Sequence, residues 1–222
     1  MRTTLTVTEE PTAEPVSIEQ VKRHCRIDSN ADDELLTGYL TAARVMAEGY
    51  LSRALLTQTL LWTMRPSSEL PRDRLRLHGT LELPRAPVQS ILSVTTLDEW
   101  GNTTTISPAS LPVTPPPGSS ARGQAQAILG YVADLTLEPA TLFIGPETVL
   151  SGGFAAYRTK LQHLQVSMVA GYGAADDVPS TVIQAIMMTT AFLYEHRGDS
   201  AAAMPDAAQW LLDRQRLQFL GG

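Results

Sequence analysis

The clearest signal for the fold lies in residues 179–198, Pro-Ser-Thr-Val-Ile-Gln-Ala-Ile-Met-Met-Thr-Thr-Ala-Phe-Leu-Tyr-Glu-His-Arg-Gly. Proline is favoured in the first turn of a helix and glycine commonly follows the last, so Pro179 and Gly198 predict a helix between them. This helix is apolar on nearly every side. A helix of that kind in water must be covered on more than one face, by other helices or by a neighbouring subunit.

The N-terminal part of the chain predicts two more helices. Ser17 and Gln20 have the spacing of a capping box, which predicts a short helix ending near Arg26. Asn30 can cap a second helix that runs to about Leu51, since apolar residues recur there at helical spacing. They are Leu35, Leu36, Tyr39, Leu40, Ala43, Met46, Ala47 and Tyr50.

The middle of the chain is rich in residues that favour strands, and the C-terminus returns to a helical pattern. We expect strands near 57–64, 88–97, 103–106, 131–137, 141–144 and 161–169, with a glycine-rich turn at 170–173. The proline-rich stretch 107–123 cannot pack a core and predicts a mobile loop. A last helix opens at Pro205 and contains Trp210, Leu211, Leu212, Leu217, Phe219 and Leu220.

This order of elements predicts an α+β protein. We expect residues 1–54 and 176–222 to form one discontinuous helical bundle, from which the β-rich region 55–175 projects as an insertion.

Composition excludes several classes of function. The 17 Lys and Arg against 23 Asp and Glu give a net charge of −6, so the chain as a whole has no counterion-release drive toward nucleic acid, and an anionic membrane is disfavoured for the same reason. The first ten residues lack the apolar run of a secretory signal, and no stretch approaches 18 consecutive apolar residues, so we expect synthesis in the cytoplasm.

No catalytic, cofactor or metal site is predicted. Gly171-Tyr172-Gly173 lacks the third glycine of a dinucleotide fingerprint and is interpreted as a turn. The four histidines lie in different elements without metal-ligand spacing, and the single cysteine, Cys25, is more typical of packing than of reaction. We therefore expect no enzyme activity.

Several segments of the chain resemble those of a known protein family, and this resemblance implies a function. The N-terminal order Glu14-Pro15-Val16-Ser17, Val21 to Asp28 and Asp32-Asp33-Glu34-Leu35-Leu36 resembles the opening of phage head-to-tail connector (adaptor) proteins, as found in long-tailed phages and gene transfer agents. Leu83-Pro84-Arg85-Ala86-Pro87-Val88 looks like their central proline motif. Ala170 to Gly173, Val178-Pro179 and Leu193 to Gly198 resemble their glycine turn and following helix.

The resemblance implies a structural virion protein of the head-tail neck. Such an adaptor assembles as a ring, dodecameric in this family, on the portal protein. It extends the DNA channel without binding DNA specifically and offers a docking platform to a tail-side neck or stopper protein. We expect portal contacts from Trp210, Arg214, Arg216 and Phe219, although Trp210 and Phe219 could equally close the bundle. We expect subunit packing from the apolar helix, through Ile183, Ile186, Met187, Phe192 and Tyr194.

Two alternatives stay open from the sequence. Another neck, tail-completion or head-decoration subunit would share this composition. A small DNA-binding regulator with a helix-turn-helix at 17–51 is disfavoured by charge, because residues 17–53 hold five basic and six acidic side chains.

Overall fold

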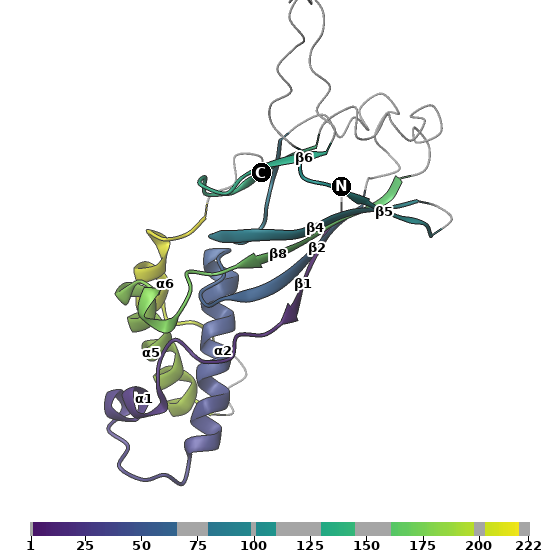
Figure 1. The fold of residues 1–222 in the computed structure, drawn as a ribbon. Helices are drawn as coiled ribbons and strands as arrows, with labels where there is room; N and C mark the ends of the chain where they lie inside the picture. Colours follow the sequence, from purple (N-terminus) through teal and green to yellow (C-terminus); the bar gives the residue numbers. More distant parts are fainter. Residues whose placement is uncertain are drawn as a thin grey trace, which may run out of the picture. The chain divides into compact units, whose positions relative to one another are not determined.

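The computed structural model describes residues 2–65, 80–98, 101–109, 130–144, 161–197 and 203–217. Most of the predicted proline-rich loop 107–123, namely residues 110–123, lies outside these ranges, as does Phe219. Helices and strands are both present, so the predicted α+β class is confirmed (Figure 1). The chain divides into two compact units. One, here called the helical unit, holds residues 9–58, 84–87 and 170–222, and the other, the β unit, holds 1–8, 59–83 and 88–169.

The helical unit contains α1 (Ile18–Cys25), α2 (Asp33–Leu51), α5 (Ser180–Glu195) and α6 (Asp206–Asp213), with a short 3-10 helix at Ala175–Asp177. Figure 1 shows these helices side by side; α5 packs against α1, α2 and α6, and α2 also contacts α1 and α6. The predicted apolar helix is therefore covered on several sides by other helices of the same chain.

The core of the helical unit follows the periodicity of the sequence. Each of the main helices contributes side chains three or four residues apart, which places them on one face. The fully or nearly fully buried members are Leu36, Leu40, Ala43, Ala47 and Leu51 of α2, Val182, Ala185, Ile186 and Leu193 of α5, and Ala208 and Leu212 of α6.

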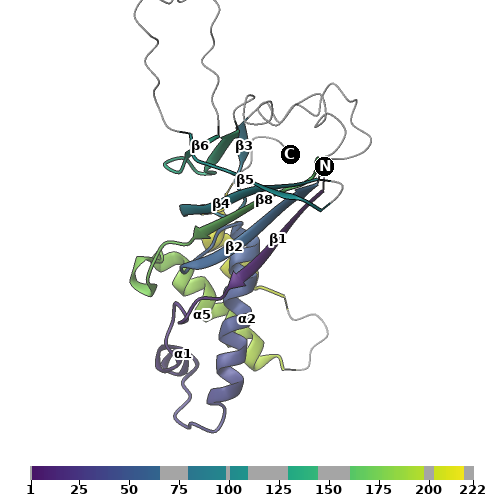
Figure 2. The same cartoon turned by 45° about the vertical axis from the view of Figure 1, so that its right-hand side comes forward.

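Two sheets make up the β unit. The larger has the strand order β1-β2-β8-β4-β5, with β1 at Arg2–Glu9, β2 at Gln58–Arg65, β8 at Leu161–Ala170, β4 at Val88–Asp98 and β5 at Thr103–Ile106. The smaller has the order β3-β7-β6, with β3 at Thr80–Glu82, β7 at Thr141–Ile144 and β6 at Tyr131–Asp134. Figure 2 shows both sheets, and β1 and β5 are the two edges of the larger one.

The sequence pattern does not predict strand β1, because the segment has the composition of a polar leader. Its sequence, Arg-Thr-Thr-Leu-Thr-Val-Thr-Glu, is exposed along nearly its whole length, so the strand shows no burial pattern from which to infer a sheet. Its neighbour in the sheet, β2, lies some fifty residues further on; Thr8 Oγ1 donates to the Thr59 carbonyl at 3.1 Å.

Candidate functional site

The predicted capping box at the start of α1 is present. The Ser17 hydroxyl accepts from the Gln20 amide, and the Gln20 side chain accepts from the Ser17 amide at 2.8 Å. Lys22 of α1 stabilises the loop into α2 by donating to Asn30 and by an ion pair with Asp33 at 2.8 Å. The Tyr194 hydroxyl of α5 donates to Asp32 at 2.6 Å. The acidic start of α2 is therefore engaged within the chain, and Asp32 and Asp33 both have partners there.

A buried charge network crosses the helical unit at α2. Arg44 is 4% exposed and Glu48 is 6% exposed, and the two form an ion pair at 3.2 Å. Arg44 Nε also donates to Glu14 at 2.9 Å. Glu48 Oε1 accepts from the Leu55 amide at 2.8 Å and from the Gln58 side chain at 2.9 Å. Glu48 therefore ties α2 to the chain that follows it, and Arg44 ties α2 to the segment before α1.

Burial has the largest effect on the pKa of the Glu48 carboxyl. It raises the pKa of the Glu48 carboxyl, and it outweighs the lowering by the Leu55 amide, by Arg44 and Arg85, and by Gln58. The folded chain then binds more protons than the unfolded chain between the unfolded pKa, about 4.3, and the raised folded value. Across that window this group makes the free energy of unfolding fall as pH rises.

Glu48→Gln therefore removes one source of pH dependence. We expect the free energy of unfolding of the wild type, minus that of Glu48→Gln, to decrease as pH rises from about 4 through the raised pKa, because only the wild type must then bury a charge. Urea unfolding followed by circular dichroism at a series of pH values measures this difference. An increase with pH would contradict the prediction and would show that pairing with Arg44 outweighs burial.

The proline motif at residues 83–88 closes the C-terminal end of α2. Arg85 has a positive φ of 69°, and its guanidinium donates to the carbonyls of Glu48 and Arg53. The Glu48 carbonyl also accepts from the backbone amides of Ser52 and Arg53, so the guanidinium adds a donor at the end of the helix. The Ala54 amide donates to the Ala86 carbonyl at 3.0 Å. The motif is therefore a structural clamp at the helix end.

The glycine turn after β8 is also structural. Gly171 has a φ of +131°, and the Tyr172 amide beside it donates to the Leu55 carbonyl at 3.2 Å. A Cβ at Gly171 would lie 2.2 Å from the Leu56 carbonyl oxygen. Only glycine allows the two backbone segments to approach this closely.

Gly171→Ala is expected to destabilise the chain by about 2–4 kcal/mol, because the substitution combines a strained φ with a backbone overlap. Gly38→Ala is the matched control. Gly38 lies within α2, and a Cβ added there would meet nothing within 4 Å, so alanine should stabilise the chain by up to about 1 kcal/mol. Chemical denaturation of both variants checks the pair, and equal effects would refute the close approach at Gly171.

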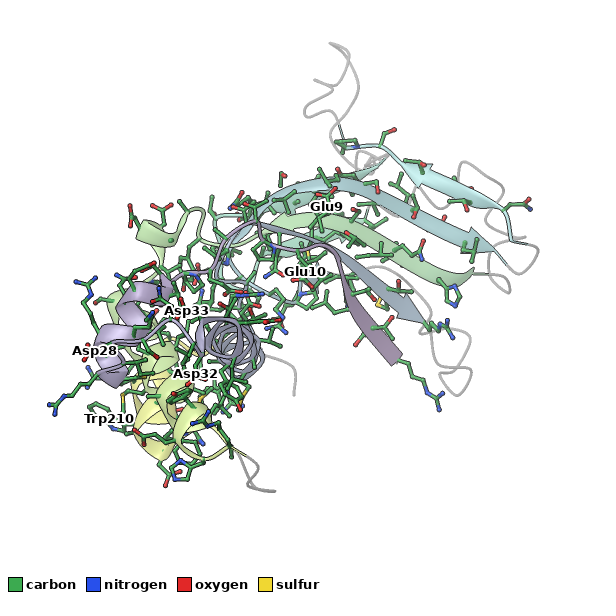
Figure 3. All side chains as sticks on the ribbon, turned by 90° about the horizontal axis from the view of Figure 1, so that it is seen from below. Glu9, Glu10, Asp28, Asp32, Asp33 and Trp210 are labelled. Atoms are coloured by element: carbon green, nitrogen blue, oxygen red, sulfur yellow. The ribbon has the colours of Figure 1, made fainter. Side chains whose placement is uncertain are left out.

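The predicted portal contacts that the structure describes, on α6 and directly after it, lie at the surface. Trp210 is 67% exposed, and Figure 3 shows it at the outside of the helical unit. Arg214 and Arg216 are also exposed, and the Arg216 guanidinium lies 5.1 Å from the centre of the Tyr50 ring. Trp210 therefore does not close the core of this chain, whereas Leu212 of the same helix does.

The residues expected to pack against a neighbouring subunit fall into two groups. Ile186 is fully buried in the chain's own core. The other four are partly exposed: Ile183, Met187, Phe192 and Tyr194. Phe192 stacks on His196 with ring centres 4.1 Å apart, and Arg197 lies 4.5 Å from the centre of the Tyr194 ring. For these four residues the expectation stays a prediction.

In the part of the chain that the structure describes, no group of three or more His, Cys, Asp or Glu side chains converges to hold a metal ion. Burial, with a smaller effect of the Glu195 carboxylate, raises the pKa of the Cys25 thiol, which leaves it protonated near neutral pH. None of the described helices is long and apolar enough to cross a membrane.

The buried network was missed from the sequence, although a signal for it was present. Arg44 and Glu48 lie four residues apart on the same stripe of α2 as the buried Ala43, Ala47 and Leu51. Charged residues are almost never fully buried unless they are paired, so two opposite charges on an apolar stripe indicate an internal ion pair.

A protein-family model matches the part of the chain that contains several of these features. The family model described as phage gp6-like head-tail connector protein matches residues 15–95. That range includes the capping box, Arg44, Glu48 and the proline motif. No curated protein matches the chain.

Three solved chains share the fold over almost their whole length. One, from the neck of an empty gene transfer agent (GTA) particle computed with C6 symmetry, is 20% identical, has a TM-score of 0.65, and covers 99% of this chain and 98% of its own. Another, from the virion of a native GTA particle, is 21% identical with a TM-score of 0.64 and 98% coverage of both chains. A third, from the neck of a native GTA particle computed with C12 symmetry, is 19% identical, has a TM-score of 0.59, and also covers 98% of both. Residues 15–95 therefore resemble the phage gp6-like head-tail connector family, which confirms the resemblance predicted from the sequence.

Proposed function

We propose that this chain is a structural connector of the head-tail neck of a phage or gene transfer agent particle. It assembles as a ring on the portal, extends the DNA channel and provides the platform on which the tail docks. The observation that carries the proposal is the match of nearly the whole chain to a neck chain, together with the connector segment at 15–95. In this proposal the protein is not an enzyme, and the β-rich region is an insertion into the body formed by the N- and C-terminal helices.

The ring in this proposal has twelve subunits. Its support is the fold shared with a chain from a neck computed with C12 symmetry. Cyclic assemblies of this kind use two different surfaces on each subunit, one facing each neighbour. Counting the copies in purified necks, by electron microscopy without imposed symmetry, tests the number.

Helix α6 and the residues after it are the proposed portal contact. Trp210 is exposed in the isolated chain, and Arg214 and Arg216 accompany it. Tryptophan and arginine are the residue types most enriched among those that dominate binding energy at protein interfaces. The tail-side neck or stopper protein then binds another part of the ring.

Electron microscopy of particles made without this gene tests the connector function. We expect DNA-filled heads and separate, complete tails, because the part that joins them is missing, and restored joining when the wild-type gene is supplied in trans. Joined particles of normal appearance would reject the proposal. Empty heads or incomplete tails would point instead to another structural role in the particle.

A further inference from the structure

Strand β1 is an exposed edge of the five-stranded sheet. Residues 2–9 form the outer strand of the five-stranded sheet, and within the described residues no strand pairs with its other side. All of its side chains are exposed except Leu5, which is half-buried, and Val7 is 41% exposed. An edge strand presents a row of backbone donors and acceptors that can pair with a further strand.

This edge also lacks the features that usually prevent such pairing. Natural edge strands are protected by lysine or other charges, proline, a bulge or short length. Strand β1 has eight residues, and its interior, Thr-Thr-Leu-Thr-Val-Thr at 3–8, holds no charge, proline or glycine. Arg2 and Glu9 stand only at its ends. The interior composition, four threonines and a valine, favours strand pairing.

The opposite edge of the same sheet, strand β5, is also rich in exposed threonine. Strand β5 comprises Thr103, Thr104, Thr105 and Ile106, and the three threonines are exposed. On its inner side β5 pairs antiparallel with β4, through Thr96 opposite Thr104 and Val94 opposite Ile106. Neither edge carries a charge in its interior, and threonines opposite one another on adjacent strands contribute favourably to pairing.

We propose that β1 of one subunit pairs with β5 of the neighbouring subunit, so that the sheets join edge to edge around the ring. The inference rests on the proposed ring. A closed ring needs two different complementary surfaces on one subunit, and the two unlike edges of this sheet supply such a pair. A second copy of this chain is the occupant favoured by the uncharged, threonine-rich character of both edges.

Site-directed cross-linking in assembled particles tests the pairing. In a Cys25→Ser background, Thr104→Cys or Thr105→Cys is combined in turn with Thr3→Cys, Thr4→Cys or Thr6→Cys. Residues directly opposite on paired strands have Cβ atoms about 4.5–5.5 Å apart, close to the span of a disulfide. After mild oxidation we expect at least one combination to give a ladder of covalent multimers of this chain on a non-reducing gel. Each single-cysteine variant should give none.

The outcomes separate this inference from the proposed function. Dimers from a β1 cysteine alone, cross-links to a different particle protein, or the absence of any ladder from particles with occupied necks would each overturn the edge pairing and leave the connector role standing. Joined particles that do not contain this chain would instead overturn the connector role.

A charge variant with a matched control gives a second measurement. Thr6→Lys places a charge within the edge, and Thr12→Lys makes the same change at an exposed threonine beyond the strand. We expect Thr6→Lys to reduce the yield of joined particles at least about tenfold and Thr12→Lys to leave it unchanged, because edge lysines oppose pairing. Equal yields would count against the pairing.

Discussion

Glu48→Ala is expected to lower the free energy of unfolding by about 3–5 kcal/mol, the cost typical of removing one partner from a buried ion pair. The loss has two parts. Arg44 keeps its charge in a buried position with one ion-pair partner fewer, and the Leu55 amide and the Gln58 side chain lose their acceptor. An unsatisfied buried polar group costs about 1–3 kcal/mol by itself. Urea unfolding at neutral pH measures the change.

Two controls make this result specific. Glu34→Ala removes an exposed glutamate from the first turn of the same helix, and we expect it to cost no more than about 1 kcal/mol through the helix dipole. The double variant Arg44→Ala/Glu48→Ala should cost less than the sum of its single variants, by about 0.5–3 kcal/mol, since the two side chains interact directly. A cost for Glu48→Ala near that of Glu34→Ala would show that the network contributes little.

The helices were predictable because their signals are local. The capping box at Ser17, the apolar stripe of α2 and the proline before α5 each lie within a few residues of the feature they specify. Burial on a helix follows a fixed period, so the core could be inferred from spacing alone. The central strands β2 and β4 were predictable for a similar reason, since β-branched and aromatic residues gather there.

What the sequence did not reveal depends on partners far along the chain. The burial of Arg44 depends on Glu14, thirty residues earlier, and the clamp at the end of α2 depends on Arg85, thirty-seven residues after Glu48. Strand β1 is defined by pairing rather than by burial, so its side chains carry no pattern. The exposure of Trp210 was equally undetermined, because an aromatic residue on a short helix fits a core as well as a surface.

That exposure leads to the prediction with the largest expected effect on assembly. Trp210→Ala should weaken binding to the purified portal ring by about 2 kcal/mol or more, which is about thirtyfold in the dissociation constant. The reason is that Trp210 is 67% exposed in the isolated chain, so burial of its indole is available to an interface. Surface plasmon resonance against immobilised portal measures the affinity, and electron microscopy should show correspondingly fewer joined particles.

Stability measurements distinguish an interface role from a role in the core. The free energy of unfolding of Trp210→Ala should stay within about 0.5 kcal/mol of the wild type, as for surface substitutions in general. Leu137→Ala, which truncates another exposed apolar side chain, should alter neither stability nor portal affinity. If Trp210→Ala unfolded more easily and bound the portal normally, α6 would serve the fold of the isolated chain. Unchanged stability with lost binding is the result expected of a contact that only assembly completes.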